Sequence, residues 1–241
     1  FCLSRGLGDV YKRQSYENLF LRKEIAGFRT NIRREQSCSI KSLTRDYLYK
    51  QLLSSGEYTF DHMLVIKDPY GEAPLTALAL FILEEPARVR VTTKGNLEVT
   101  DFVTELPKKK EHRVPILGMY AEKANDIVIE ILDDEGNCVK SHTFTIRTKR
   151  LPKSLRNVIT VKKWTDKPAY SNIMINGGVK IHTCVFDIEG KIRYYLSRKP
   201  RGYGIFPLSD GHFFYMEKYI SVPSYSNPQT VESYDMDYFG R

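Results

Sequence analysis

Apolar side chains follow helical spacing near the start of the chain. Residues 42–55 carry Leu43, Tyr47, Leu48 and Leu52 at the spacing of one helix face, which predicts a helix there. Gly56 follows directly and predicts the end of this helix. Residues 16–27 show a fainter pattern of the same kind. We therefore expect residues 15–56 to form a partly helical flank.

After Gly56 the apolar spacing changes to the period of two that half-buried strands show. Strands are expected at 62–66, 75–83, 88–91, 99–106, 127–132 and 139–147. Pro86 should interrupt the chain between the second and third, leaving Glu84 and Glu85 in a solvated turn. The turn DDEGN predicts a hairpin between the last two. Strands about ten residues apart without helices predict an immunoglobulin-like β-sandwich over residues 57–148.

A second all-β region is expected over residues 149–241, after a linker of cations and proline at residues 149–153. Two hairpins are predicted around the turns DIEG and PLSDG, and a last strand at Ser233–Phe239. Four or five short antiparallel strands make up one propeller blade. A lone blade cannot bury both faces of its sheet, so a truncated propeller is expected.

The composition fits a mainly β globular chain. The 241 residues are 41% apolar, which argues against intrinsic disorder, and the apolar run Ala77–Leu83 is too short to span a membrane. The net charge is +8, and residues 15–50 hold eight basic and four acidic residues. The rest is nearly neutral, so no nucleic-acid partner is expected. The flank is expected to be a solvated arm, with contact to phosphate or lipid headgroups as the alternative.

Residues 1–14 have neither helical nor strand spacing. They read FCLSRGLGDVYKRQ and begin with Phe1, which resembles a translated sequencing-adapter tail. Such a segment is excluded from fold reasoning. We expect the native N-terminus to be missing, so the absence of a signal peptide predicts no compartment.

Cysteine and histidine spacing points away from metal and redox chemistry. The four cysteines form no CxxC pair, which argues against a disulfide framework or a zinc ribbon, and Cys138 and Cys184 are expected to be inert core thiols. The five histidines form no HExxH motif, so no metal site is expected. His142 and His182 are expected to be structural strand histidines. Neither a GxSxG nor a phosphate-binding glycine motif is present.

His212 is the one candidate for chemistry, because it follows the turn ending in Gly211 at the start of a strand. An imidazole there can act as acid, base or nucleophile. The alternative is that its ring caps the turn by bonding to the backbone. Nearby aromatic residues could stack on an aryl or sugar ligand, with Arg198, Lys199 and Arg201 meeting an anion. The alternatives are a strand core and a solvated loop rim.

The order of motifs over residues 60–241 resembles the bacterial aryl-sulfate sulfotransferase family. It runs from DPYGEAPLTALALFILEEPARVRVTTKG through HRVPILGMYAEKANDIVIEILDDEGN to FDIEGKIRYYLS, PLSDGHFF and YDMDYFGR. The resemblance implies a β-sandwich followed by a six-bladed β-propeller. The basic segment 15–55 departs from the family's pattern.

The resemblance also implies a reaction. A sulfuryl group passes from a phenolic sulfate ester to a phenol through a sulfated histidine, and no 3′-phosphoadenosine phosphosulfate is required. The donor, the phenol acceptor and a second copy of the chain are the implied partners, in a periplasmic or exported protein. The first catalytic histidine is expected in a His-His-Asp stretch after YDMDYFG, whereas this chain stops at Arg241.

No catalytic, cofactor-binding or metal-binding residue is therefore assigned within this chain, with His212 kept as a weak catalytic candidate. The fragment itself is expected to be inactive. One alternative is a non-enzymatic sandwich and propeller module that binds glycans or proteins. Another is a nucleic-acid binder acting through residues 22–50.

Overall fold

The computed structural model describes most of the chain after the first 33 residues. The described residues are 34–162, 172–175, 183–197, 204–208, 212–220 and 229–241. The helical segment expected at residues 16–27 lies outside these ranges, as do His182 and the cations of residues 198–201. Within the described ranges, no helix has both the length and the apolar character to cross a membrane.

The helix α2 (Arg34–Ser54) confirms the prediction for residues 42–55 and begins eight residues earlier. It ends before Gly56, as expected. Its inward face agrees with the predicted one in part. Leu48 and Leu52 pack against the core that contains the buried Tyr49 and Leu53, whereas Leu43 and Tyr47 are 66% and 67% exposed. Spacing alone therefore identified only part of the side that packs.

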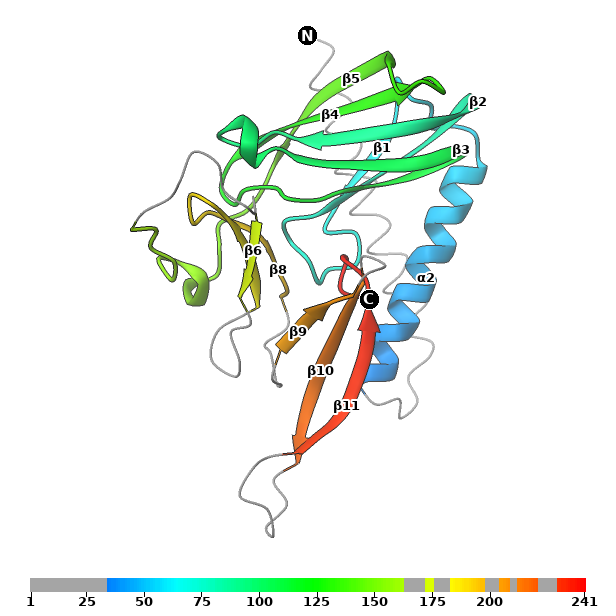
Figure 1. The fold of residues 1–241 in the computed structure, drawn as a ribbon. Helices are drawn as coiled ribbons and strands as arrows, with labels where there is room; N and C mark the ends of the chain where they lie inside the picture. The colour runs from blue at the N-terminus through cyan, green and yellow to red at the C-terminus, as the bar shows by residue number, and fades with distance from the viewer. Residues whose placement is uncertain (1–33, 163–171, 176–182, 198–203, 209–211, 221–228) are drawn as a thin grey trace.

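Five antiparallel strands form the large sheet at the top of Figure 1. They are β1 (Leu64–Lys67), β2 (Ala77–Thr93), β3 (Phe102–Ile116), β4 (Ala124–Leu132) and β5 (Cys138–Arg147). The short 3-10 helix η1 (Glu98–Thr100) lies between β2 and β3. One edge of β2 pairs with β3, and the other pairs first with β1 and then with β4, which continues to β5. The hairpin predicted around DDEGN is confirmed as β4 and β5.

The first half of β2 is buried on both faces. Ala77, Ala79 and Phe81 belong to the main core, whereas Leu78 and Leu80 belong to a second core under α2. Alternate residues of a strand point to opposite faces, so the two sets point away from each other. This explains the uninterrupted apolar run in the sequence, because neither face meets water.

The main core lies inside the bent sheet and extends to the C-terminal strands. It joins Val89, Val114, Ile127 and Ile146 of the sheet to residues of the first C-terminal hairpin, including Ile192. Leu155, in the 3-10 helix η2 (Lys153–Leu155) after the expected linker, is also buried in this core. The chain is thus mainly β, as predicted, and the linker region carries a buried anchor.

Pro86 does not interrupt the strand, so the prediction of two strands separated by a turn is wrong. Glu84, Glu85 and Pro86 lie within β2, exposed to solvent. The register slips here, because Ile82 faces Glu111 of β3 while Ala87 faces Lys109. Proline is tolerated at such a bulge because its missing N–H is not needed by the ladder.

The C-terminal strands form two three-stranded sheets. The first has the order β6 (Asn172–Ile175), β7 (Cys184–Asp187), β8 (Ile192–Tyr195), and the second has the order β11 (Gln229–Met236), β10 (Phe213–Ile220), β9 (Gly204–Pro207). Both predicted hairpins are present. The last strand ends at Met236, earlier than expected, because a turn begins at Asp237. The strands are compatible with propeller blades, and the blade itself stays a prediction.

Two turns fifty positions apart repeat the same hydrogen bonds. The Asp187 carboxylate accepts from the N–H groups of Glu189 and Lys191, and the Asp237 carboxylate accepts from those of Phe239 and Arg241. In both, the glycine three residues after the aspartate has a positive φ, 75° and 82°, a conformation open mainly to glycine. The Asp133 turn of the β4–β5 hairpin makes the same bonds, with Gly136 at a φ of 94°, so this turn also occurs within the sheet domain and does not by itself identify a propeller repeat.

Candidate functional site

A buried polar group joins the large sheet to the first C-terminal hairpin, and we call it the junction cluster (Arg193, Asp187 and Tyr120). Arg193 of β8 is 1% exposed and Asp187 at the end of β7 is 0% exposed. Their ion pair spans 3.4 Å from Nη1 to Oδ2. The guanidinium also lies 4.0 Å above the ring of Tyr120, so the charge contacts a carboxylate and an aromatic face.

Hydrogen bonds cross from the cluster into the sheet region. Arg193 donates through Nε to the carbonyl of Gly118, and through Nη1 to the carbonyl of Thr100 at 2.7 Å and the Tyr120 hydroxyl at 3.0 Å. The Tyr120 hydroxyl donates to Asp187 at 2.8 Å. Burial raises the pKa of Tyr120, and the bond to Asp187 raises it further. Tyr120 therefore stays protonated at neutral pH and serves as a donor.

The junction cluster is built for positioning. Buried charges are tolerated when paired and hydrogen-bonded, and here a single arginine bonds to two carbonyls, a phenol and a carboxylate. Nη2 of Arg193 has no partner among the described residues, so the group is not fully satisfied. The cluster fixes the first hairpin to the end of the sheet without exposing a reactive atom.

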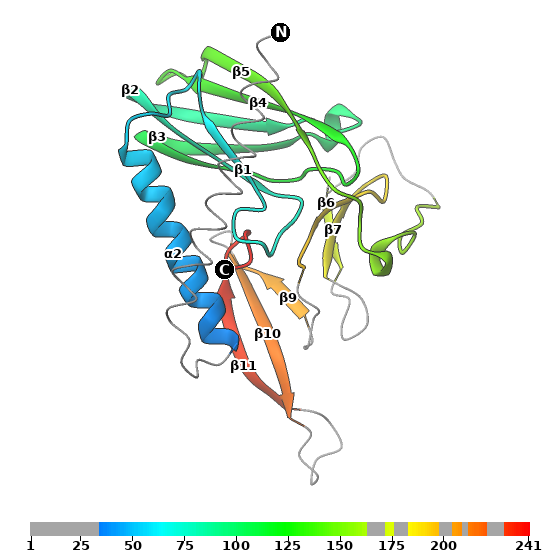
Figure 2. The same ribbon diagram turned by 180° about the vertical axis from the view of Figure 1, so that it is seen from behind.

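A second polar cluster joins α2, the sheet and the C-terminal turn. Asp46 of α2 accepts from Tyr70 and from Arg113 of β3, each at 2.6 Å, and also pairs with Arg241. Figures 1 and 2 show the C-terminal turn beside α2 from both sides. Partial burial opposes ionisation of Asp46, but the bonds from Tyr70 and Arg113 and the charge of Arg241 lower its pKa overall. Asp46 is therefore ionised at neutral pH and holds the three elements together.

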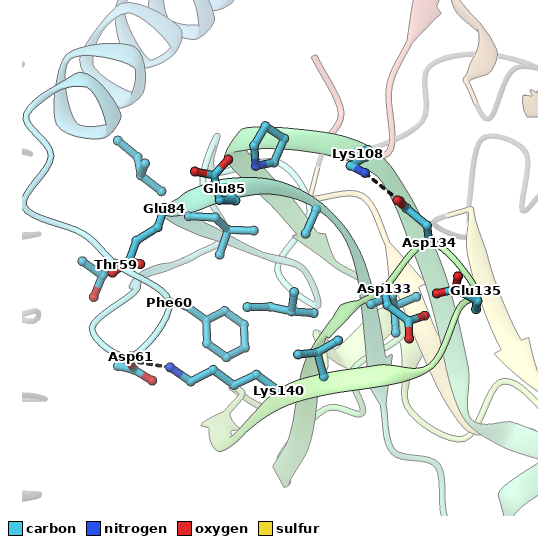
Figure 3. Close-up of a pocket in the computed structure, with 17 residues that line it drawn as sticks. Thr59, Phe60, Asp61, Glu84, Glu85, Lys108, Asp133, Asp134, Glu135 and Lys140 are labelled. Atoms are coloured by element: carbon cyan, nitrogen blue, oxygen red, sulfur yellow. Dashed lines mark hydrogen bonds and ion pairs between the residues drawn. The ribbon is translucent and has the colours of Figure 1, made fainter.

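An open cleft of about 630 Å³ lies on the large sheet, where β2 bulges beside the β4–β5 turn (Figure 3). We call it the acidic cleft. Its apolar lining consists of Phe60, Ile82, Leu83, Pro86, Ala87, Ile131, Leu132 and Val139. Its charged lining consists of Asp61, Glu84, Glu85, Asp133, Asp134 and Glu135 with Lys108 and Lys140. Six carboxylates against two ammonium groups give this surface a negative charge within a positive chain.

Some of these charges already have partners. Lys140 donates to Asp61 at 2.7 Å and Lys108 donates to Asp134 at 2.6 Å, as the dashed lines in Figure 3 mark. Bonds from the side chain and backbone of Asn137 lower the pKa of Asp133. The side chains of Glu84, Glu85 and Glu135 form no hydrogen bond or ion pair within the described part of the chain.

The structure places His212 beside a carboxylate. Its Nδ1 lies 2.8 Å from Oδ1 of Asp235 on β11, a partner that neither sequence interpretation anticipated. A carboxylate orients an imidazole in many active sites. Here the two side chains are 44% and 64% exposed, so the water-excluded setting that strengthens such pairs is missing. His212 stays a weak candidate.

The other sequence candidates are mostly structural. His142 packs against the rings of Phe60 and Phe144, as expected of a strand histidine. Cys184 is buried, which raises the pKa of its thiol to about 11. Cys138 is exposed, so its prediction as a core residue is wrong, since it begins an edge strand. No group of three or more ligating side chains suitable for a metal occurs among the described residues.

Neither the junction cluster nor the acidic cleft was predicted from the sequence. Arg193 and Asp187 look like exposed polar residues of a turn and an alternating strand. One signal was available, because Arg193 stands between Ile192 and the two tyrosines of β8. All four residues of this strand are buried. The cleft carried no comparable signal, because Glu84 and Glu85 lie far in sequence from Glu135.

Comparison with known proteins matches the described sheet to one domain type. Residues 64–149, which include β1–β5, match the model of the arylsulfotransferase Ig-like domain. The chain is also 27% identical over 150 residues to the arylsulfate sulfotransferase AssT of Escherichia coli O6:H1, an alignment covering 58% of this chain and 24% of that protein. The chain thus spans about a quarter of the length of the curated relative it matches. These matches confirm the resemblance that the motifs indicated.

Proposed function

We infer that this chain, whose residues 64–149 match the arylsulfotransferase Ig-like domain, is the N-terminal part of an aryl-sulfate sulfotransferase. The domain match carries the inference. It is supported by the two three-stranded antiparallel sheets that follow the domain, β6-β7-β8 and β11-β10-β9, which are compatible with propeller blades. In this proposal the sheet domain is the base from which the propeller begins, and the junction cluster sets the position of its first hairpin.

The proposed reaction moves a sulfuryl group between phenols in two displacements. An imidazole nitrogen attacks the sulfur of the donor ester, the S–O bond breaks, and the phenolate leaves and takes up a proton. An acceptor phenol, losing its proton, then attacks the same sulfur and the N–S bond breaks. The covalent intermediate replaces one difficult displacement by two easier ones. We propose that no nucleotide sulfate donor takes part.

None of the reacting residues is assigned to the described part of this chain. The described surface near the sheet is acidic, and a sulfate ester is an anion, so the acidic cleft would repel the donor. His212 with Asp235 is too open to water to carry a transfer alone. We therefore propose that the 241-residue chain by itself does not transfer sulfate, and that its role is structural.

The test compares two proteins in one assay. The 241-residue chain and the full product of the gene are each given 4-nitrophenyl sulfate, with and without phenol and without any nucleotide. We expect the full product to release 4-nitrophenolate only when phenol is present, and the 241-residue chain to release none. Release in water alone would indicate a sulfatase. Phenol-dependent release by the 241-residue chain would show that its own residues carry the reaction.

A further inference from the structure

The acidic cleft is a gap in the pairing of β2, open to solvent and lined by apolar side chains. On the edge of β2 opposite β3, the ladder with β1 ends at Leu80 and the ladder with β4 begins at Arg88. Between them only Ile82 is paired, through its N–H to the carbonyl of Tyr58. Leu83–Pro86 have no ladder partner in either neighbouring strand. Pro86 has no N–H and the segment bulges, features that blunt an edge against ladder pairing, so an extended chain in the cleft would be held mainly by its side chains.

The walls of the gap suit the side chains of such a segment. The floor of the cleft, Leu132 and Leu83, is already shielded from water, at 2% and 6% exposed. The apolar surface that meets water belongs to Val139 and Pro86 and to the half-buried Ile82 and Ile131. Val139 at the mouth is 68% exposed, although it is a large apolar side chain. A small apolar side chain entering the cleft would remove this surface from water, which is favourable.

The charges around the mouth of the cleft determine which sign of charge a partner must carry. Glu84 and Glu85 stand on the β2 side and Glu135 on the β4–β5 turn, with the cleft between them in Figure 3. All three side chains are exposed, and none forms a hydrogen bond or ion pair within the described residues. Arg88 fixes the turn by donating to the carbonyls of Asp133 and Asp134 at 2.8 and 2.9 Å. The turn therefore presents its carboxylates at a defined place.

We propose that the acidic cleft binds an extended, cationic segment of a partner protein, with lysine or arginine alternating with small apolar residues. In a strand, alternate side chains point to opposite sides, so the cations reach the three glutamates while the apolar side chains contact the floor. The chain carries a net charge of +8, which repels cations at long range. Binding of a cationic peptide therefore has to come from this local surface. The site is separate from the proposed sulfuryl transfer, whose substrate is an anion.

The probe is the peptide acetyl-Lys-Val-Lys-Val-Lys-amide, titrated into the 241-residue chain by calorimetry at low salt. The triple variant Glu84→Gln/Glu85→Gln/Glu135→Gln removes the three free charges while keeping the shape of each side chain. Exposed ion pairs contribute little each, and three together should weaken binding about ten-fold. The peptide acetyl-Glu-Val-Glu-Val-Glu-amide should not bind.

The matched control variant is Glu98→Gln/Glu122→Gln/Asp126→Asn. It removes the same number of exposed carboxylates, near the opposite end of β4. We expect it to bind the lysine peptide within about two-fold of the unmodified chain, since screened charges act over only ~10 Å. An equal loss in both variants would mean that overall charge drives binding, and the proposal would be wrong.

Other occupants give distinct results. The unmodified chain could bind calcium but not the lysine peptide, and the cleft variant could lose that calcium binding. This result would make the cleft a cation site and overturn the proposal. If sedimentation shows a dimer of the unmodified chain that is absent in the cleft variant alone, the occupant is a second copy of the chain, which also overturns the proposal. No binding of the lysine peptide to the unmodified chain has the same consequence. None of these results depends on whether the full gene product transfers sulfate.

Discussion

Replacing Arg193 by methionine tests whether the junction cluster holds the first hairpin to the sheet. The substitution removes the bonds to the carbonyls of Gly118 and Thr100 and leaves the 0% exposed carboxylate of Asp187 without its cation. Removing one partner of a buried ion pair costs about 3–5 kcal/mol, because the other charge stays buried. Methionine keeps most of the side-chain length, so the loss of stability comes mainly from the missing charge and hydrogen bonds and less from a cavity.

The loss should be measured by urea unfolding of the 241-residue chain. At a slope of about 2–3 kcal/mol per molar urea, a loss of about 3–5 kcal/mol lowers the midpoint by roughly 1–2.5 M. The control is Arg90→Met, which breaks the partly exposed pairs with Glu105 at 2.8 Å and Glu130 at 3.6 Å and should cost no more than about 1 kcal/mol. Arg193→Lys should recover only part of the loss, because lysine lacks the forked geometry. A loss below about 1 kcal/mol for Arg193→Met would refute the assignment.

Three further measurements test the packing. Leu80→Ala should cost about 2–5 kcal/mol in urea unfolding because Leu80 is fully buried under α2, whereas Leu43→Ala on the exposed side should change stability by less than about 0.5 kcal/mol; similar losses would contradict the burial pattern. Gly190→Ala should destabilise more than Gly56→Ala, since both have a positive φ but only the Cβ at Gly190 would lie 3.0 Å from Val161; equal effects would place the cost in the backbone alone. Burial lowers the pKa of His112, so the stability that its neutral ring contributes is present above a pH of about 6.5 and is lost as the pH falls. In His112→Phe the free energy of unfolding should therefore depend less on pH between about pH 6.5 and 5. An unchanged pH dependence would count against a buried neutral imidazole.

Local turn chemistry made several elements predictable from the sequence. The DDEGN turn places aspartate and glycine where the chain must reverse, and β4 and β5 follow from it. Gly56 correctly marked the end of α2. The run Ala77–Leu83 predicted a buried strand, and the structure adds the reason, which is burial on both faces.

The errors arose where tertiary contacts override local preference. Pro86 was expected to end a strand, but the register slip in β2 leaves no ladder bond for its missing N–H to break. Cys138 was expected in the core, yet it begins β5, whose first four residues are all exposed. For Arg193 and Asp187, polarity suggested exposure, because pairing across elements is invisible in one sequence. The chemistry of transfer was predictable only through the family resemblance.

The most direct test of the proposed function is to follow the sulfuryl group itself. The full product of the gene would be incubated with 4-nitrophenyl sulfate and ring-deuterated phenol, and the products identified by mass spectrometry. The proposed transfer predicts deuterated phenyl sulfate in equal amount to the 4-nitrophenolate released. Inorganic sulfate in place of the deuterated ester would contradict it.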